Sequence, residues 1–452
     1  MSNSSDTGVS DAASESQQRA AAYVERAKRD AALIPDIATD LPTRPIARAA
    51  VIGAGTMGGG IAMALANIGI PVTVIEAEAA ALDRGLQRVR ENYASSVKRG
   101  RLEQTAMDRR LALINGSLSM DEVGTADIII EAVFEDMDLK QGIFRKLDTL
   151  ARPGAILATN TSGLDVNAIA AVTRRPQDVV GAHFFSPAHV QRLLEVVRAD
   201  QTAKDVVATL MDLGRRMGKI AVQARVYEGF IGNALFRNYT REAHFLVEEG
   251  ALPHEVDQAL VRFGYAMGIF AVHDMAGNDV GYQTKKKLMA TRPQDRRYSD
   301  LIMKLCDLGR LGQKSGAGWY RYEKGDRTPQ RDPEVEAFIV AESARLGIVR
   351  RPIPEAEIIE RCLYGMINEG AKLLEHGIAL RASDIDIVYV TGYGFPAHRG
   401  GPMYYADEVG LPKVLAAIER FHAEHGYWWQ PAPLLQRLTS TGGRLADFRP
   451  GA

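Results

Sequence analysis

Two ionisable side chains in apolar surroundings are the first candidates for chemistry. His183 ends the apolar stretch 179–183, and Glu195, twelve residues later, lies inside the apolar stretch 193–197. A carboxylate among aliphatic side chains is costly unless it is paired, and a histidine would satisfy it. The carboxylate would in turn fix the imidazole tautomer and raise its basicity, as a general base requires. The spacing alone leaves a second interpretation open, which is a structural histidine in the core.

A glycine-rich turn is the second candidate. Residues 53–58 read GAGTMG, a G-x-G-x-x-G pattern between an apolar segment and a helical one. Gly53 permits a tight turn, Gly55 has no Cβ to block a pyrophosphate, and Gly58 lets the helix pack closely. The N-terminus of that helix attracts phosphates through its N–H groups. The pattern predicts a dinucleotide site, with a merely flexible turn as the alternative. The predicted contacts are Gly53, Gly55, Thr56, Met57 and Gly58.

Glu76 indicates which dinucleotide is bound. It ends an apolar segment, 71–76, and follows Gly58 by eighteen residues, close to the spacing of a ribose-binding acid. A carboxylate accepts both ribose hydroxyls and repels a 2′-phosphate. Its neighbours Ala77 and Glu78 provide no arginine. The sequence therefore favours NAD over NADP.

These candidates need strands and helices to position them. Apolar segments alternate with helix-length stretches, at residues 48–52, 71–76, 126–132, 155–158 and 179–183. Such alternation predicts a parallel, doubly wound sheet. Ligand sites in open α/β sheets gather at the carboxyl ends of strands, which is where His183 is expected.

The strand signal fades after about residue 226, so we expect an α/β domain followed by all-α domains. The predicted division is a disordered tail (about 1–18) with a linker helix in 1–45, an NAD-binding domain in 46–226, and two mostly helical domains in 227–330 and 331–452. The helical regions echo each other, because Glu249-Gly250 precedes Asp257 by the spacing with which His376-Gly377 precedes Asp384. The match is short, so duplication and chance both stay open.

Composition excludes several classes. A net charge of −1 over 452 residues offers no global attraction to nucleic acid or anionic membranes. No apolar run reaches the length of a membrane-spanning helix, so no membrane insertion is expected. The N-terminus lacks the features of a secretory signal, and the C-terminal RPGA is no peroxisomal address. The two cysteines, Cys306 and Cys362, fit a reducing compartment, so we expect a cytoplasmic protein. No bound metal is predicted.

Several separated motifs resemble the L-3-hydroxyacyl-CoA dehydrogenase family. They are NTSGLDVNAIA, GAHFFSPAHVQRLLEVV, EGFIGNALF, EEGALPHEVDQAL and LGQKSGAGWYRY. A later segment, GYGFPAHRGGPMYYADEVG, resembles the second C-terminal domain of multifunctional β-oxidation enzymes. The resemblance covers about residues 20–425. It implies a Rossmann-type sheet followed by two mostly helical C-terminal domains. The enoyl-CoA hydratase domain of those enzymes is expected to be missing, because fewer than about 50 residues precede the first strand.

The resemblance implies four catalytic positions. His183 matches the family base in HFFSP and Glu195 its acidic partner in LLEVV, while Ser162 and Asn233 match the NTS and GFIGN motifs. In the implied reaction, His183 removes the hydroxyl proton of (S)-3-hydroxyacyl-CoA while C3 gives a hydride to NAD, and Ser162 and Asn233 bind the substrate. A capping serine and a helix-face asparagine are the alternatives.

The same matching suggests further contacts. Glu135 and Lys140 resemble residues near the nicotinamide ribose, with an ordinary exposed pair of charges as the alternative. Ser186 and Lys314 are weaker cofactor candidates. Lys98 matches loosely and would meet a CoA phosphate, unless it is a solvated helix lysine.

The resemblance also bears on assembly. Short family members dimerise through a single C-terminal domain. Two such domains in one chain are expected to pack together, so we expect a monomer, with docking to a thiolase or hydratase left open. The rival functions are a non-catalytic NAD-binding relative and a β-hydroxyacid dehydrogenase, which acts on free acids with a lysine base.

Overall fold

The computed structural model describes residues 6–280, 282–289 and 292–451. It divides into two compact units, which we call the sheet unit and the helical unit. The sheet unit comprises Ala22–Asn233, His376–Tyr393 and the described residues from Arg449; the helical unit comprises the described residues up to Ala21, Ala234–Glu375 and Gly394–Phe448. Every helix in the described part of the chain is too short or too polar to cross a bilayer.

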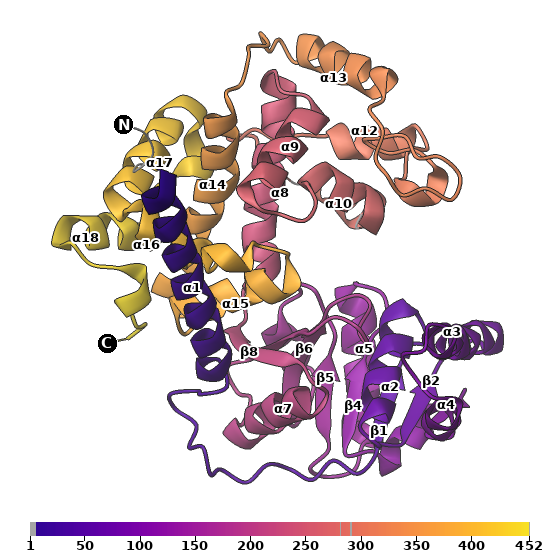
Figure 1. The fold of residues 1–452 in the computed structure, drawn as a ribbon. Coiled ribbons are helices and arrows are strands. Elements are labelled where there is room, and N and C mark those ends of the chain that lie inside the picture. The colour runs from indigo at the N-terminus through magenta and orange to yellow at the C-terminus, as the bar shows by residue number, and fades with distance from the viewer. Residues whose placement is uncertain (1–5, 281, 290–291, 452) are drawn as a thin grey trace. The chain divides into compact units, whose positions relative to one another are not determined.

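An eight-stranded sheet forms the core of the sheet unit (Figure 1). Its spatial order is β3-β2-β1-β4-β5-β6-β7-β8. The strands from β3 to β6 in this order are parallel, β7 is antiparallel to β6, and β8 is parallel to β7. The predicted doubly wound sheet is therefore confirmed. The bounds are β1 (Ala49–Ile52), β2 (Val72–Ile75), β3 (Ile114–Ser117), β4 (Ile128–Glu131), β5 (Ile156–Thr159), β6 (Val179–Phe184), β7 (Leu193–Arg198) and β8 (Ile220–Arg225).

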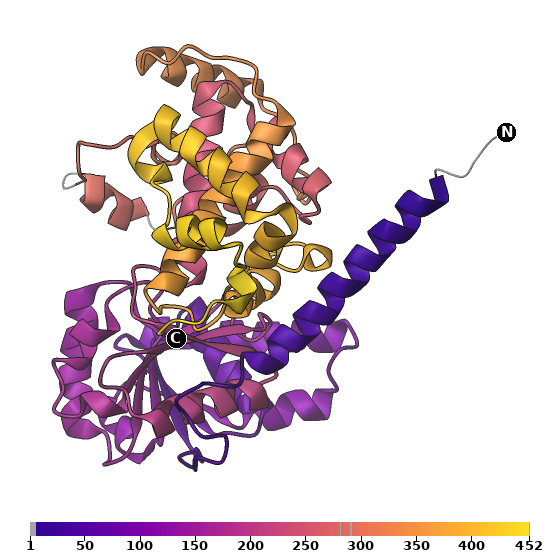
Figure 2. The same cartoon turned by 90° about the vertical axis from the view of Figure 1, so that its left-hand side faces the viewer.

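Helices lie on both sides of the strands (Figure 2). The central strands are rich in Val and Ile and are buried throughout, as expected when both faces of a parallel sheet are covered. The helices of this unit are α2 (Thr56–Asn67), α3 (Ala79–Lys98), α4 (Gln104–Leu111), α5 (Met137–Leu150), α6 (Val166–Ala170), α7 (Lys204–Arg216) and α15 (Ala382–Gly392).

One helix from the far end of the sequence belongs to this unit. α15 packs against β7 and β8, although the sequence assigned it to the second helical domain. The Arg225 N–H donates to the Ile378 carbonyl at 2.9 Å, and a Cβ on Gly392 would lie 2.4 Å from Leu193. The segment 376–393 thereby contacts the edge strand β8, whose backbone groups would otherwise be unpaired. The predicted domain boundaries at 226 and 330 stay a prediction.

The N-terminal segment also differs from the expectation. α1 runs Asp6–Asp30, whereas the sequence predicted a disordered tail to about residue 18 and a helix from Ala20. The described part of the tail, residues 6–18, contains two Ala, one Glu and two Gln, which favour helix. Residues 1–5 lie outside the described residues. The Tyr23 hydroxyl on α1 donates to Asp386 on α15 at 2.6 Å.

The helical unit contains two sets of helices. The first is α8 (Gly232–Glu249, which begins in the sheet unit), α9 (Pro253–Phe263), α10 (Ile269–Ala276), α11 (Tyr282–Met289), α12 (Leu301–Asp307) and α13 (Pro333–Arg345). The second is α14 (Glu355–Glu375), α16 (Pro402–Val409), α17 (Leu411–His425) and α18 (Pro433–Thr441).

An aspartate makes the same pair of bonds in both sets. Asp274, the sixth residue of α10, accepts the N–H groups of Trp319 and Tyr320 at 2.9 and 3.0 Å. Asp407, the sixth residue of α16, accepts those of Leu445 and Ala446 at 2.9 and 3.0 Å. Burial raises the pKa of both carboxyls. The same pair of carboxylate–backbone bonds in both sets supports the duplication that the sequence left open.

A buried arginine joins the two sets. Arg361 on α14 has no exposed surface and bonds to Glu249 at 2.5 Å and to Glu242 at 3.1 Å, both on α8. Burial opposes its charge, but the two carboxylates raise its pKa. The repeats therefore pack on each other through a paired charge within one unit.

Replacing either aspartate with alanine tests whether these paired bonds stabilise both sets of helices. Asp274→Ala and Asp407→Ala each leave two backbone N–H groups unpaired, so each should lower the free energy of unfolding by about 1–3 kcal/mol in urea titrations. Asp326→Ala, at a fully exposed residue, is the control and should change it by less than about 0.5 kcal/mol. An unchanged Asp407→Ala protein would contradict the equivalence.

Candidate functional site

The glycine turn lies at the carboxyl end of β1, where the strand order reverses between β2 and β4. Gly53 has a φ of 102°, and a Cβ on it would lie 2.8 Å from the Ala132 carbonyl oxygen. A Cβ on Gly58 would lie 1.8 Å from the Gly53 carbonyl oxygen, so the helix and turn approach too closely for alanine. At Gly55, by contrast, nothing lies within 4 Å of the Cβ position.

This open space fits a pyrophosphate at the N-terminus of α2, which starts with Thr56 and Met57. Glu76 follows β2, and its Oε2 accepts the Ala54 N–H at 2.9 Å. A carboxylate beside the glycine turn is placed to bind a ribose. The glycine turn and Glu76 together therefore form a site that fits NAD.

His183 and Glu195 form a bonded pair on neighbouring strands. They are direct partners in the antiparallel register of β6 and β7, and Nδ1 of His183 lies 2.7 Å from Oε2 of Glu195. Glu195 has no exposed surface and His183 is 6% exposed. Oε1 of Glu195 also accepts the N–H groups of Ile231 and Gly232 at 3.2 and 3.0 Å. With Nδ1 held in this way, Nε2 is the ring nitrogen that remains for a substrate.

Aromatic rings hold the imidazole from the side. The ring centroids of Phe185 and Phe230 lie 4.3 and 5.8 Å from that of His183. These ring contacts and the bond to Glu195 together hold the His183 ring in the orientation that the structure shows.

Ser162 and Glu135, two residues predicted by motif matching, are brought together. Oε1 of Glu135 accepts the backbone N–H of Ser162 at 2.7 Å and its hydroxyl at 2.8 Å. The Thr161 hydroxyl donates to the same oxygen at 2.7 Å. Glu135 therefore orients the loop that follows β5.

Asn233, in the first turn of α8, completes the cluster. Its Nδ2 donates to the Ser162 carbonyl oxygen at 3.0 Å. Since the preceding residue, Gly232, donates to Glu195, the start of α8 links the Ser162 loop to the His183–Glu195 pair. The four predicted catalytic positions thus lie in one bonded cluster within the sheet unit.

Glu131 lies beside the cluster and was not among the residues predicted from the sequence. It is fully buried at the end of β4, and its carboxylate accepts both the Lys140 ammonium, at 2.8 and 2.9 Å, and the Thr159 hydroxyl, at 2.7 Å. Lys140 is also fully buried, with its Nζ 3.6 Å from Glu135. The rule applied to Glu195, an acid within an apolar strand, would have found Glu131 in Ile128–Glu131.

Three predicted contacts are not brought into this cluster. Ser186 is exposed on the loop between β6 and β7, and Lys98 is exposed at the end of α3. Lys314 belongs to the helical unit, where it pairs with Asp279 at 2.5 Å. Their roles stay predictions.

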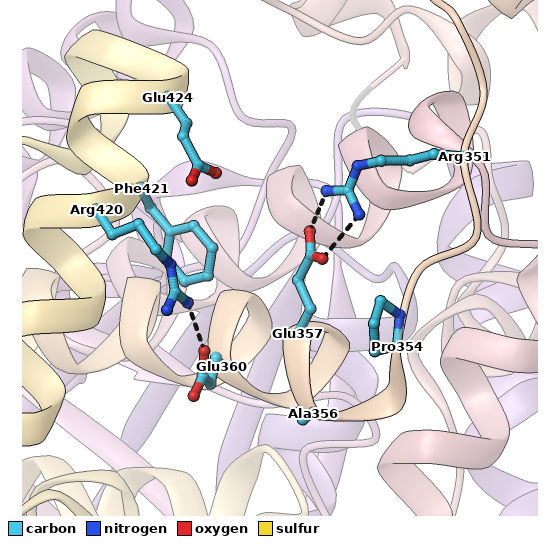
Figure 3. Close-up of a pocket in the computed structure, with 8 residues that line it drawn as sticks. All are labelled: Arg351, Pro354, Ala356, Glu357, Glu360, Arg420, Phe421 and Glu424. Carbon is cyan, nitrogen blue, oxygen red and sulfur yellow. Dashed lines mark hydrogen bonds and ion pairs between the residues drawn. The ribbon is translucent and has the colours of Figure 1, made fainter.

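A cavity of about 560 Å³ lies elsewhere, in the helical unit (Figure 3). Its arginines are paired, Arg351 with Glu357 at 2.5 Å and Arg420 with Glu360 at 2.7 Å. None of its eight lining residues is a predicted site residue. Among the described residues, no group of His, Cys, Asp and Glu side chains is arranged to hold a metal.

A buried lysine donates hydrogen bonds to the loop that joins His183 to Glu195. Lys219 is 8% exposed, and its ammonium donates to the carbonyls of Ala188 and Gln191 at 2.6 and 2.7 Å. A Cβ on Gly60 would lie 3.1 Å from Ala188, so the same loop rests on α2. Burial lowers the pKa of Lys219 to about 8.

The lowered pKa of Lys219 predicts a pH dependence of stability. Between pH 8 and its ordinary value of 10.5, the unfolded chain binds more protons at this group than the folded chain does. The wild-type free energy of unfolding should therefore rise relative to that of Lys219→Met as pH rises through this window. Urea titrations at several pH values measure the difference, which should be flat from pH 6 to 7. A flat difference up to pH 10.5 would contradict it.

Two family models match the chain. Residues 48–227 match the model described as 3-hydroxyacyl-CoA dehydrogenase, NAD binding domain. Residues 229–322 and 358–445 match the model described as 3-hydroxyacyl-CoA dehydrogenase, C-terminal domain. The second model matches two separate segments, as an internal repeat predicts.

Individual proteins agree with these matches. The chain is 45% identical over 416 residues to the peroxisomal bifunctional enzyme of Danio rerio, covering 88% of this chain and 57% of that protein. It is similar in structure to the 3-hydroxybutyryl-CoA dehydrogenase of Escherichia coli K12, with a TM-score of 0.75 and 26% identity over 88% of this chain and 99% of that chain. It is also similar to the dehydrogenase part of multifunctional enzyme 1 from C. elegans, with a TM-score of 0.66 and 28% identity over 92% of this chain and 96% of that chain. The chain therefore spans little more than half the length of the curated relative.

Proposed function

Because this chain belongs to the 3-hydroxyacyl-CoA dehydrogenase family, we propose that it interconverts (S)-3-hydroxyacyl-CoA and 3-ketoacyl-CoA with NAD. One observation carries the proposal. The buried His183–Glu195 pair is bonded, through the start of α8, to the Asn233–Ser162 pair in the unit that carries the glycine turn.

The proton and the hydride leave the substrate by different routes. NAD would be held by the glycine turn and Glu76, and it would supply the hydride acceptor for C3. Nε2 of His183 takes the hydroxyl proton, and Glu195 stabilises the imidazolium that forms. In the direction of reduction the imidazolium returns the proton to the oxygen of the new alcohol. The backbone N–H bonds to Glu195 keep its carboxylate in place during both steps.

Asn233 and Ser162 are proposed to hold the substrate oxygen. One Nδ2 hydrogen of Asn233 is used by the Ser162 carbonyl, which leaves the second for a substrate acceptor. Ser162 is exposed, but its only hydroxyl hydrogen is donated to Glu135, so its oxygen is left to accept a hydrogen from the substrate. The Asn233 donor is fixed before the substrate arrives, so it stabilises developing charge without reorganisation.

His183→Ala tests the assignment. With acetoacetyl-CoA and NADH, loss of the general base should lower kcat by at least about 10²-fold, read as NADH absorbance. His376→Ala, at an exposed histidine in the same unit, is the matched control and should keep wild-type activity. A His183→Ala protein with unchanged kcat would reject the role of His183.

The same assay separates the rival functions. A non-catalytic NAD-binding relative would bind NADH but leave acetoacetyl-CoA unchanged. A β-hydroxyacid dehydrogenase would instead reduce free acetoacetate with a lysine base. Lys140, whose Nζ lies 3.6 Å from Glu135, is fully buried on Glu131, which disfavours that reaction.

We propose that the protein is a monomer. The two segments that match the C-terminal model already pack on each other within the helical unit, with Arg361 bonded to Glu242 and Glu249. Light scattering should give the mass of one chain, about 49.3 kDa, at all concentrations. A concentration-independent dimer mass would overturn this.

Compartment and partners belong to the proposal as well. Both cysteines are free, which supports a reducing compartment such as the cytoplasm. The Danio rerio relative is peroxisomal by name, so a peroxisomal location is the alternative. Docking to a thiolase or hydratase stays a prediction, as does the contact of Lys98 with CoA.

A further inference from the structure

Tyr393 reaches the candidate site from the far end of the chain. It follows α15 and lies in the second segment that matches the C-terminal model, 358–445, yet it belongs to the sheet unit. Its hydroxyl donates to Oδ1 of Asn233 at 2.8 Å. The second repeat thus contributes a side chain to the cluster around Ser162.

This bond completes the orientation of the Asn233 amide. An amide has an acceptor oxygen and a donor nitrogen, and the two ends are not interchangeable. Here Oδ1 faces the Tyr393 hydroxyl and Nδ2 faces the Ser162 carbonyl at 3.0 Å. The flipped amide would place two acceptors against each other at Ser162. Because both ends of the Asn233 amide are bonded, its second Nδ2 hydrogen points in one fixed direction.

The Tyr393 ring is itself held tightly. It stacks on Tyr389 with ring centroids 4.9 Å apart and meets the Phe185 ring edge-on at 5.6 Å. A Cβ on Gly232 would lie 2.4 Å from the Tyr393 ring, so a larger residue at the start of α8 would displace the ring. The Tyr389 hydroxyl donates to the Gly232 carbonyl at 3.0 Å. The hydroxyl of Tyr393 therefore has little freedom to leave Asn233.

We propose that Tyr393 is a positioning residue of the dehydrogenase reaction. It fixes the Asn233 amide so that the second Nδ2 hydrogen is available to the C3 oxygen of the substrate. The inference rests on the proposed function. It gives the second repeat a part in the chemistry in addition to its packing against α8.

A double-mutant cycle tests the inference. Tyr393→Phe removes only the hydroxyl and should lower kcat for acetoacetyl-CoA reduction about five- to tenfold, with the KM for NADH unchanged. In an Asn233→Ala background, the same substitution should change kcat by less than about twofold, because its target is absent. A merely structural tyrosine would give equal losses in both backgrounds.

Tyr93→Phe is the matched control. The Tyr93 hydroxyl donates to Oδ1 of Asn67 at 2.9 Å, which is the same chemistry at the opposite end of α2 from the glycine turn. This variant should keep wild-type kcat. Circular dichroism and NADH binding verify the fold of each variant. If Tyr393→Phe does not fold, 4-aminophenylalanine introduced at position 393 replaces it, because its amino group donates from the position of the tyrosine hydroxyl. A folded protein with this replacement and a loss as large as that of Asn233→Ala would overturn the inference.

The two proposals fail in different ways. A wild-type protein that does not oxidise NADH with acetoacetyl-CoA would contradict the proposed function. An active wild type with an inactive His183→Ala variant, but with Tyr393→Phe at full activity, would overturn the role of Tyr393 alone.

Discussion

The arrangement of the site depends on one buried carboxylate. Glu195 has no exposed surface and lies in a strand of aliphatic residues, where an unpaired charge would be strongly destabilising. Its oxygens are satisfied by His183 across the strand pair and by the N–H groups of Ile231 and Gly232. The N-terminus of α8, with its partial positive charge, is a favourable place for this anion. The need to pair one charge therefore joins β6, β7 and α8.

A second buried carboxylate organises the neighbouring strands by the same principle. Glu131 ends β4 and takes the Lys140 ammonium and the Thr159 hydroxyl. Lys140 lies 3.6 Å from Glu135, and Glu135 holds Ser162. Two acids in apolar strands thus fix His183 on one side of the cluster and Lys140, beside Glu135, on the other.

The repeats have kept some contacts and changed others. Asp274 and Asp407 hold equivalent backbone groups. Asp257 and Asp384, which mark the repeat in the sequence, have different partners. Asp257 accepts the N–H groups at the start of α10, while Asp384 pairs with Arg381. Burial raises the pKa of both to about 6. The copy that contains Asp384 packs on β7 and β8, and this brings Tyr393 to Asn233.

The sequence alone determined the elements whose causes are local. Strand-forming Val and Ile runs, the glycines of the turn and the acid after β2 follow from steric and hydrophobic rules, so the doubly wound sheet and the NAD site were predictable. The cost of a buried charge also pointed to Glu195, and motif matching supplied Ser162 and Asn233. Only the tertiary structure decided that Glu135 bonds to Ser162, that Lys140 is buried on Glu131, and that Tyr393 crosses from the second repeat. These contacts join residues separated by up to 160 positions, and no local pattern records which distant segment packs against which.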